Sequence, residues 1–217
     1  MLKTIINGGW CMVPLMICSV LCFAVILERW ISLKAARIDT KAFMQRIWEL
    51  VVAGKDEEAI LLTESTPGPV AAILNAGLRK MEFLRSIGRS PEEVEAGAIK
   101  AMQDQGVNAV AELERYLVIL ASIGTLAPLF GFLGTVTGMI HAFDKIAAMG
   151  GIQPEAVASG IAEALITTAA GLIIATPAYL AYNAYTQKVQ GFVLEIEESS
   201  AKLMEAVAAA SVQQRTS

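Results

Sequence analysis

The stretch LAPLFGFLGTVTGMIHAF, residues 126–143, determines which class of protein the sequence predicts. It contains no Asp, Glu, Lys or Arg, so it is apolar enough to lie in a membrane. It also contains three glycines, two threonines, one proline and the only histidine of the chain. A helix that merely anchors a protein in lipid needs few such residues, so this stretch predicts contact with other helices or with water.

The composition of the whole chain favours a membrane protein. Of the 217 residues, 55% are hydrophobic and only 18% are charged. The apolar residues gather in three blocks, which lie between Lys3 and Glu28, between Arg115 and Asp144, and between Glu163 and Lys188. Each block is long enough to cross a hydrocarbon core of about 30 Å as a helix. The net charge of −4 and the lack of a Lys/Arg cluster argue against nucleic-acid binding.

The residues that could carry covalent or metal chemistry are few. Cys11, Cys18 and Cys22 are spaced by 7 and 4 residues near one helical face, without a CxxC motif, and are interpreted as small apolar side chains. The chain has no phosphate-binding loop, no HExxH and no nucleophile elbow. We therefore expect no enzymatic activity, no metal site and no cofactor.

Basic residues beside the blocks predict the orientation in the membrane. They follow the first block, precede the second and follow the third, at Arg29, Lys34, Arg37, Lys41, Arg115 and Lys188. Because such residues favour the cytoplasmic side, we expect an outer N-terminus and a cytoplasmic C-terminus. A cleaved signal peptide is a less favoured interpretation of the first block, since no A-x-A-like site follows it.

The expected fold is all-α, with three transmembrane helices and long helical extensions in the cytoplasm. We expect an N-terminal transmembrane helix in 1–33 and a cytoplasmic helical domain in 34–115. A transmembrane hairpin then occupies 116–187, with an outer loop at about 144–158, and a cytoplasmic helix occupies 188–217.

The cytoplasmic parts carry clear helix boundaries. Ser90-Pro91-Glu92-Glu93 predicts a capped helix start, and nothing after it strongly interrupts a helix before Pro128. We therefore expect one helix from about 91 to 147, roughly 85 Å long. Turns at 53–56 and 66–69 should divide residues 39–89 into shorter helices. Apolar residues repeating every seven positions predict that the third block continues as a helix to about 210.

The second block carries small and polar residues on one helix. Gly131, Gly134 and Gly138 lie beside Thr135 and Thr137, and Gly134 and Gly138 form a GxxxG pair that permits close helix packing. Within the two apolar blocks, Pro128 and Pro177 each remove a backbone hydrogen bond and are expected to permit kinks.

The third block carries a carboxylate and two hydroxyls in GIAEALITTAAGL, residues 160–172. Thr167 lies one turn from Glu163, Thr168 borders the same face, and Gly171 is a further packing residue. Counting back from the cytoplasmic end leaves Glu163 either in the outer headgroup region or inside a polar pathway. His141 is interpreted as an interfacial or packing residue from its position alone.

These residues resemble the MotA/TolQ/ExbB proton-channel family, and most closely its ExbB and TolQ branch. The resemblance rests on APLFGFLGTVTGMIHAF at 127–143 and GIAEALITTAAGL at 160–172, followed by Pro177-Ala178 and Tyr182-Asn183. It extends to the layout of three spans. Thr137 stands where ExbB and TolQ proteins of enteric bacteria often carry Trp.

The resemblance implies a homopentamer in the bacterial inner membrane, with the second and third helices lining a central pore. Two copies of an ExbD- or TolR-like single-span protein would lie inside, carrying the proton on an aspartate, and a TonB- or TolA-like protein would be driven. Matched residue by residue, the pore-lining residues would be Thr135, Glu163 and Thr168, with Thr137, Thr167 and His141 as additional candidates.

Other functions stay open at this point. A passive membrane scaffold would use the glycines and threonines only for packing. A self-sufficient channel or transporter is disfavoured by the single carboxylate in the membrane blocks. A flagellar or gliding-type stator, or a variant driven by Na⁺, would share the proposed mechanism.

Overall fold

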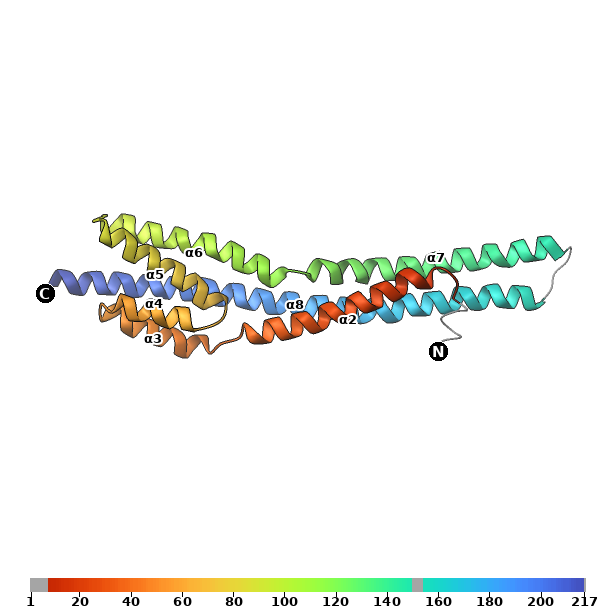
Figure 1. Ribbon diagram of the computed structural model, residues 1–217, viewed down its shortest axis with the longest axis horizontal. Coiled ribbons are helices and arrows are strands. Elements are labelled where there is room, and N and C mark those ends of the chain that lie inside the picture. The colour runs from red at the N-terminus through yellow and green to blue at the C-terminus, as the bar shows by residue number, and fades with distance from the viewer. Residues whose placement is uncertain (1–7, 150–153, 217) are drawn as a thin grey trace. The chain divides into compact units, whose positions relative to one another are not determined.

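The computed structural model describes residues 8–149 and 154–216, and all regular structure in these ranges is helical. The helices are α2 (Met12–Ala35), α3 (Thr40–Val52), α4 (Asp56–Ser65), α5 (Pro69–Ser86), α6 (Pro91–Glu114), α7 (Leu117–Met149) and α8 (Pro154–Thr216) (Figure 1). Three helical segments, which include α2, α7 and α8, are long and apolar enough to cross a membrane. The prediction of an all-α chain with three such segments is confirmed.

The chain divides into two compact units. The first contains residues up to Trp30 together with Tyr116–Thr186, and the second contains Ile31–Arg115 and Gln187–Ser217. Helices α2 and α8 contribute to both units. The apolar blocks and the polar helices therefore build separate cores.

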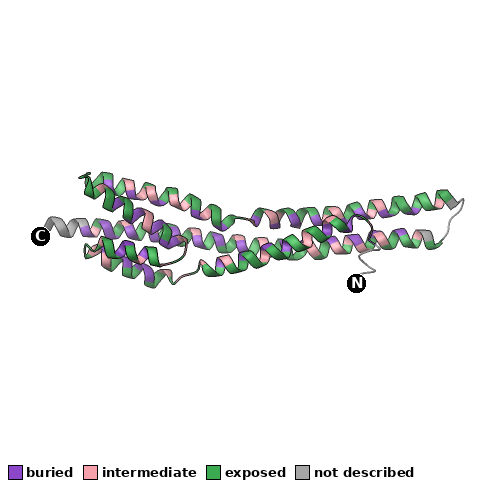
Figure 2. Ribbon diagram, in the orientation of Figure 1, coloured by how far each residue is buried: buried purple, intermediate pink, exposed green. Residues whose placement is uncertain are grey.

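In the first unit, α7 and α8 pack as an antiparallel pair. Gly138 lies against Gly160, whereas Gly131 lies against Gly171 further along the same contact. Helix α2 is tied to α8 by the Tyr185 hydroxyl, which donates a hydrogen bond of 2.8 Å to the Ile26 carbonyl. Much of the apolar surface of these helices stays exposed (Figure 2), as expected where lipid or other subunits cover it.

The second unit has a conventional buried core formed by α3–α6 and the last part of α8. Ile47, Leu74 and Leu203 are all fully buried in it. Glycine at position 77 lets α5 approach α6, because a β-carbon there would lie 2.7 Å from Met102 Cγ. Thr40 at the start of α3 donates a hydrogen bond of 3.0 Å to the Glu195 carboxylate of α8.

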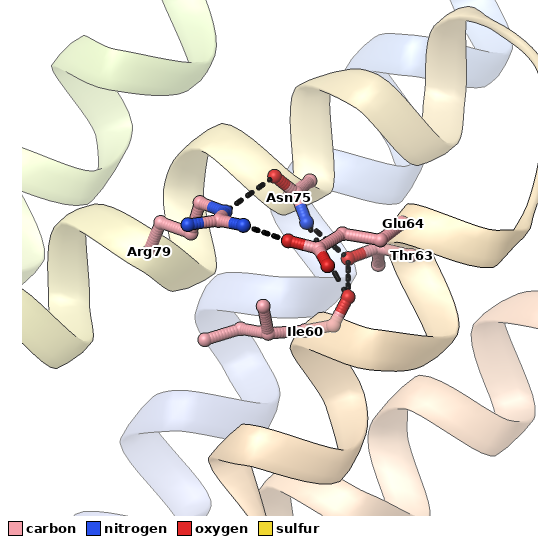
Figure 3. A network of polar contacts seen from close by, with 5 residues as sticks. All are labelled: Ile60, Thr63, Glu64, Asn75 and Arg79. Carbon is pink, nitrogen blue, oxygen red and sulfur yellow. Dashed lines mark hydrogen bonds and ion pairs between the residues drawn. The ribbon is translucent and has the colours of Figure 1, made fainter.

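Polar side chains fix α4 to α5 within this unit (Figure 3). The Asn75 amide donates to the buried Thr63 hydroxyl at 2.8 Å, and that hydroxyl donates to the Ile60 carbonyl at 2.7 Å. Arg79 donates to the Asn75 amide oxygen at 3.1 Å and pairs with Glu64. The Thr63 side chain is only 2% exposed, and its hydroxyl both accepts a hydrogen bond and donates one, so its buried polar atom is satisfied.

The helix boundaries predicted from Gly, Pro and Ser in the second unit are confirmed. Turns separate α3 from α4 and α4 from α5, with Gly54 and Gly68 at positive φ. Ser90 caps α6, since its hydroxyl accepts from the Glu93 N–H while the Glu93 carboxylate accepts from the Ser90 N–H.

The predicted continuous helix from 91 to 147 is wrong. It is interrupted at Arg115 and Tyr116, where Tyr116 adopts a φ of 68° and starts a new helix. A left-handed conformation is unfavourable for a tyrosine. It is supported here by Arg29, whose guanidinium lies 5.4 Å above the Tyr116 ring.

The predicted outer loop at 144–158 is too long. Helix α7 continues to Met149 and α8 begins at Pro154, so helices occupy 144–149 and 154–158. Proline is favourable in the first turn of a helix, and Glu155 adds a favourable negative charge there. Residues 150–153 lie outside the described ranges.

Candidate functional site

The small residues of α7 form its contact surface with α8. A β-carbon on Gly131 would lie 3.0 Å from the Thr167 carbonyl oxygen, and one on Gly138 would lie 2.8 Å from the Gly160 carbonyl oxygen. A β-carbon on Gly134 would overlap the Thr167 side chain. On the other helix, a β-carbon on Gly171 would lie 2.6 Å from the Ala127 carbonyl oxygen. We define the hairpin seam as Gly131, Gly134, Gly138 and Gly171 together with Thr167.

The two threonines of α8 have different surroundings. Thr167 is completely buried in the seam, and its hydroxyl donates to the Glu163 or Ala164 carbonyl, each at 3.0 Å. Thr168 is half-buried, and its hydroxyl lies 3.1 Å from the Ala164 carbonyl and 3.3 Å from the Gly131 carbonyl of α7. Thr168 therefore keeps a polar atom at the edge of the seam.

Glu163 lies near the end of the hairpin where α7 ends and α8 begins, and it faces the histidine of α7. Its Oε2 is 3.7 Å from His141 Nδ1, and the exposed fractions of the two side chains are 17% and 52%. The carboxylate is thus largely covered, whereas the imidazole is open to its surroundings. This pair is the only ionisable pair that the structure records between α7 and α8 in the described part of the first unit.

The turn before α2 also covers this end of the hairpin. Gly9 has a φ of 65°, and a β-carbon on it would lie 3.0 Å from Glu163 Cδ and overlap Oε1. Cys11 is buried, and its Sγ lies 3.7 Å from the Thr137 hydroxyl of α7. Residues of this turn and of α7 therefore lie at the same end of the hairpin as Glu163.

Thr135 lies outside this cluster. Its side chain is half-buried, and its hydroxyl donates to the Phe132 carbonyl of its own helix at 2.6 Å. Thr137 likewise bonds back to α7, to the Leu133 and Gly134 carbonyls at 3.2 Å each. The structure thus pairs His141 with Glu163, places Thr137 against Cys11 and buries Thr167 in the seam, whereas Thr135 bonds only within α7.

Two tryptophans indicate the depth of Glu163. Trp10, in the turn before α2, and Trp30, near the other end of the apolar part of α2, are 58% and 53% exposed. Their separation along a helix corresponds to roughly 30 Å, the thickness of a hydrocarbon core, and tryptophans concentrate at the two surfaces of a bilayer. Since Glu163 contacts Gly9, beside Trp10, we infer that it lies close to one membrane surface.

The opposite end of the first unit carries a second charged cluster. Arg29 is only 3% exposed, pairs with Glu28 and lies above the Tyr116 ring. Burial of an arginine is tolerated when a carboxylate and an aromatic face accompany it. This cluster fixes the C-terminal part of α2 against the residue that precedes α7.

The described residues contain free cysteines and no cluster of potential metal ligands. No group of three or more His, Cys, Asp or Glu side chains there could hold a metal ion. Cys11, Cys18 and Cys22 are free thiols that are buried or half-buried along α2 and the turn before it. Pro128 and Pro177 lie inside α7 and α8, and the kinks predicted there stay a prediction.

Comparison with known sequences places the chain in a family. The profile of the MotA/TolQ/ExbB proton channel family matches residues 65–198, which include α7 and the membrane part of α8. The chain belongs to this family. The Tol-Pal system protein TolQ of Pseudomonas aeruginosa is 34% identical over 181 residues, covering 82% of this chain and 77% of that protein.

Further relatives agree with this placement. TolQ of Haemophilus influenzae is 30% identical over 172 residues, covering 79% of this chain and 75% of that protein. The biopolymer transport protein ExbB of Neisseria gonorrhoeae is 48% identical over 80 residues, covering 35% of this chain and 36% of that protein. The resemblance of this family member to the TolQ and ExbB branch is therefore confirmed.

Sequence reasoning did not identify Gly9 as part of the site. Gly8-Gly9 near the start of the first apolar block is a signal for a turn, but nothing in the sequence indicates that this turn contacts Glu163, 154 positions further on. Cys11, interpreted from the sequence as a small apolar side chain, is buried, and nothing in the sequence indicates its contact with Thr137.

Proposed function

We propose that this chain is the channel and stator subunit of a proton-driven motor in the bacterial inner membrane. Membership of the family supports energy transduction through a proton channel together with a TolR- or ExbD-like partner. In the proposal, five copies surround two copies of that partner, whose membrane aspartate carries the proton. Movement of one component within the other drives a TolA- or TonB-like protein. The N-terminus is periplasmic and the C-terminus is cytoplasmic.

The observation that carries the proposal is the polar edge of the α7–α8 hairpin. Glu163 and His141 lie at one end of it, and the Thr168 hydroxyl lies about 7 Å further along α8. Thr135 contributes a half-buried hydroxyl from α7. A covered carboxylate near one membrane surface, followed by hydroxyls without fixed charge, suits a proton pathway shared with a partner that supplies the deeper carrier.

The proposal is tested with Glu163→Ala and Thr168→Ala in the intact complex. Both variants should lose proton-driven function while the complex still assembles, because neither side chain fills the centre of the hairpin seam. Thr176→Ala is the matched control: this exposed threonine of α8 also bonds back to its own helix, at 2.8 Å from the Leu172 carbonyl. Normal function of both site variants would refute the pore-lining assignment.

The assembly is tested by native mass spectrometry of complexes purified from native membranes. Five copies with two copies of a small single-span protein that carries a membrane aspartate would support the motor. A homo-oligomer without such a partner would favour a scaffold or an autonomous channel instead. Exchange of the proton gradient for a Na⁺ gradient in proteoliposomes would identify the coupling ion.

A further inference from the structure

The residues before α2 make an unusually close contact with the proposed ion-pathway carboxylate. Gly9 has a φ of 65°, which glycine adopts readily and other residues adopt at a cost. A β-carbon at this position would also overlap Glu163 Oε1 and lie 3.0 Å from Glu163 Cδ. The backbone conformation thus favours glycine, and any other residue would also displace the carboxylate end of the Glu163 side chain.

Gly9 belongs to a turn that packs against the hairpin. We define this turn as the N-terminal turn, residues 8–11. The Met12 N–H donates to the Gly9 carbonyl at 3.2 Å, which closes the turn. Gly8 packs towards α8, since a β-carbon there would lie 3.3 Å from Ile166 Cγ2. Cys11 packs towards α7 through its contact of 3.7 Å with Thr137 and is only 1% exposed. The turn is therefore anchored on both helices of the hairpin.

The two oxygens of Glu163 have different neighbours as a result. Oε1 faces the backbone of Gly9, and Oε2 faces His141 Nδ1 at 3.7 Å. The Gly9 side is covered by the turn, whereas His141 is 52% exposed. The carboxylate is consequently accessible from the side of His141.

We propose that the N-terminal turn positions the Glu163 carboxylate, with Gly9 as the positioning residue that makes the contact possible. The turn covers one oxygen and keeps the other directed to the exposed His141, so that protons exchange with Glu163 past the imidazole. The part of this inference that concerns proton exchange rests on the proposed function, whereas the contact between the turn and Glu163 does not.

The contact is tested by measuring how fast a maleimide reacts with Cys11 in the assembled complex, in a chain whose Cys18 and Cys22 are replaced with alanine. Gly9→Ala should displace the turn and speed the reaction by about tenfold or more, because backbone strain and steric overlap act together. Gly9→Asn separates the two causes. Asparagine tolerates positive φ but still brings a β-carbon, so it should also expose Cys11.

A double-mutant cycle tests whether Gly9 acts through the carboxylate. In a Glu163→Ala background the overlapping oxygen is gone, so Gly9→Asn should change the Cys11 reaction rate by less than about twofold. An equal increase with and without the Glu163 side chain would overturn the positioning role and leave only a local backbone effect. Unchanged thermal unfolding of the complex shows that the variants are folded.

Functional readouts distinguish failure of this inference from failure of the proposed function. Gly9→Asn should lower proton flux in proteoliposomes of the complete complex, and Gly9→Asn with Glu163→Asp should recover part of it, because aspartate withdraws the carboxylate by one methylene. The double-mutant cycle can show that Gly9 acts through Glu163 while Gly9→Asn has normal proton flux and Glu163→Ala has none. That combination would overturn the positioning role. If the cycle shows that Gly9 acts through Glu163 but Glu163→Ala has normal proton flux, the contact between the N-terminal turn and Glu163 is supported and the proposed function is refuted.

Discussion

Replacement of Gly134 by alanine is the sharpest test of the hairpin seam. The new β-carbon would overlap the Thr167 side chain and lie 2.8 Å from its Cγ2. Thr167 is fully buried and β-branched, so it has few other rotamers available on a helix. Moving the helices apart to make room would open the close approach at Gly138 and Gly171, where a β-carbon would lie only 2.8 and 2.6 Å from backbone oxygens of the facing helix.

The expected cost follows from these contacts. Overpacking of a rigid contact costs about 3 kcal/mol at the upper end of its range. Alanine is favoured over glycine in a helix by about 1 kcal/mol, which leaves a net loss of about 2 kcal/mol for Gly134→Ala. Gly124→Ala is the matched control on the same helix. Its β-carbon would meet Tyr179 at 3.6 Å, an ordinary contact, so this variant should gain up to about 1 kcal/mol.

The two variants should therefore differ by about 3 kcal/mol, with opposite signs relative to the unmodified chain. For a chain of this length, that difference corresponds to roughly 6–12 °C in Tm. Thermal unfolding of the purified protein in one detergent, followed by circular dichroism, measures it. A Gly134→Ala variant that melts with or above Gly124→Ala would refute the close approach of α7 and α8 on which this reasoning depends.

Three further outcomes follow from single contacts. Thr167→Ala should lower the free energy of unfolding by about 1 kcal/mol because it removes a buried methyl group, whereas Thr135→Ala should change it by less than about 0.5 kcal/mol and instead reduce proton flux. Ser90→Ala removes the capping box of α6 and should cost about 1 kcal/mol in a thermal melt. A hydrogen bond and ion pair from Lys202 lower the pKa of Glu198. The pair therefore stabilises α8 at neutral pH and is lost as the pH falls through this lowered pKa. Lys202→Met should raise the pKa of Glu198 towards its ordinary range in an NMR titration, with only the smaller effect of Lys41 left to lower it.

The turns of the second unit were predictable because their causes are local. Gly54 and Gly68 supply positive φ, and Ser90 with Glu93 supplies both halves of a capping box within four residues. The break at Tyr116 has no such cause. Arg115 and Tyr116 are acceptable helix residues, and the residue that supports the left-handed conformation is Arg29, which is distant in the sequence.

The polar residues of the candidate site were predictable from the sequence, but their burial was not. The carboxylate and hydroxyls of α8 stand out because polar groups are rare in membrane blocks. Which of the two hydroxyls is buried could not be predicted, because Thr167 and Thr168 are adjacent and differ by only about 100° around the helix. Packing against Gly134 buries the first completely, and the second stays at the edge with its hydroxyl near the Gly131 carbonyl.

The division of α7 and α8 into packed glycines and polar groups outside the seam bears on the choice between a motor and a passive scaffold. A scaffold would need the glycines of α7 as surfaces for assembly with other chains, but Gly131, Gly134 and Gly138 are already in contact with α8 of the same chain. Their small size is therefore explained by the hairpin alone. The polar groups outside the seam, Glu163 with His141 above all, are not needed for that packing. The proposed proton pathway gives them a role, and the Glu163→Ala variant decides between this pathway and a scaffold.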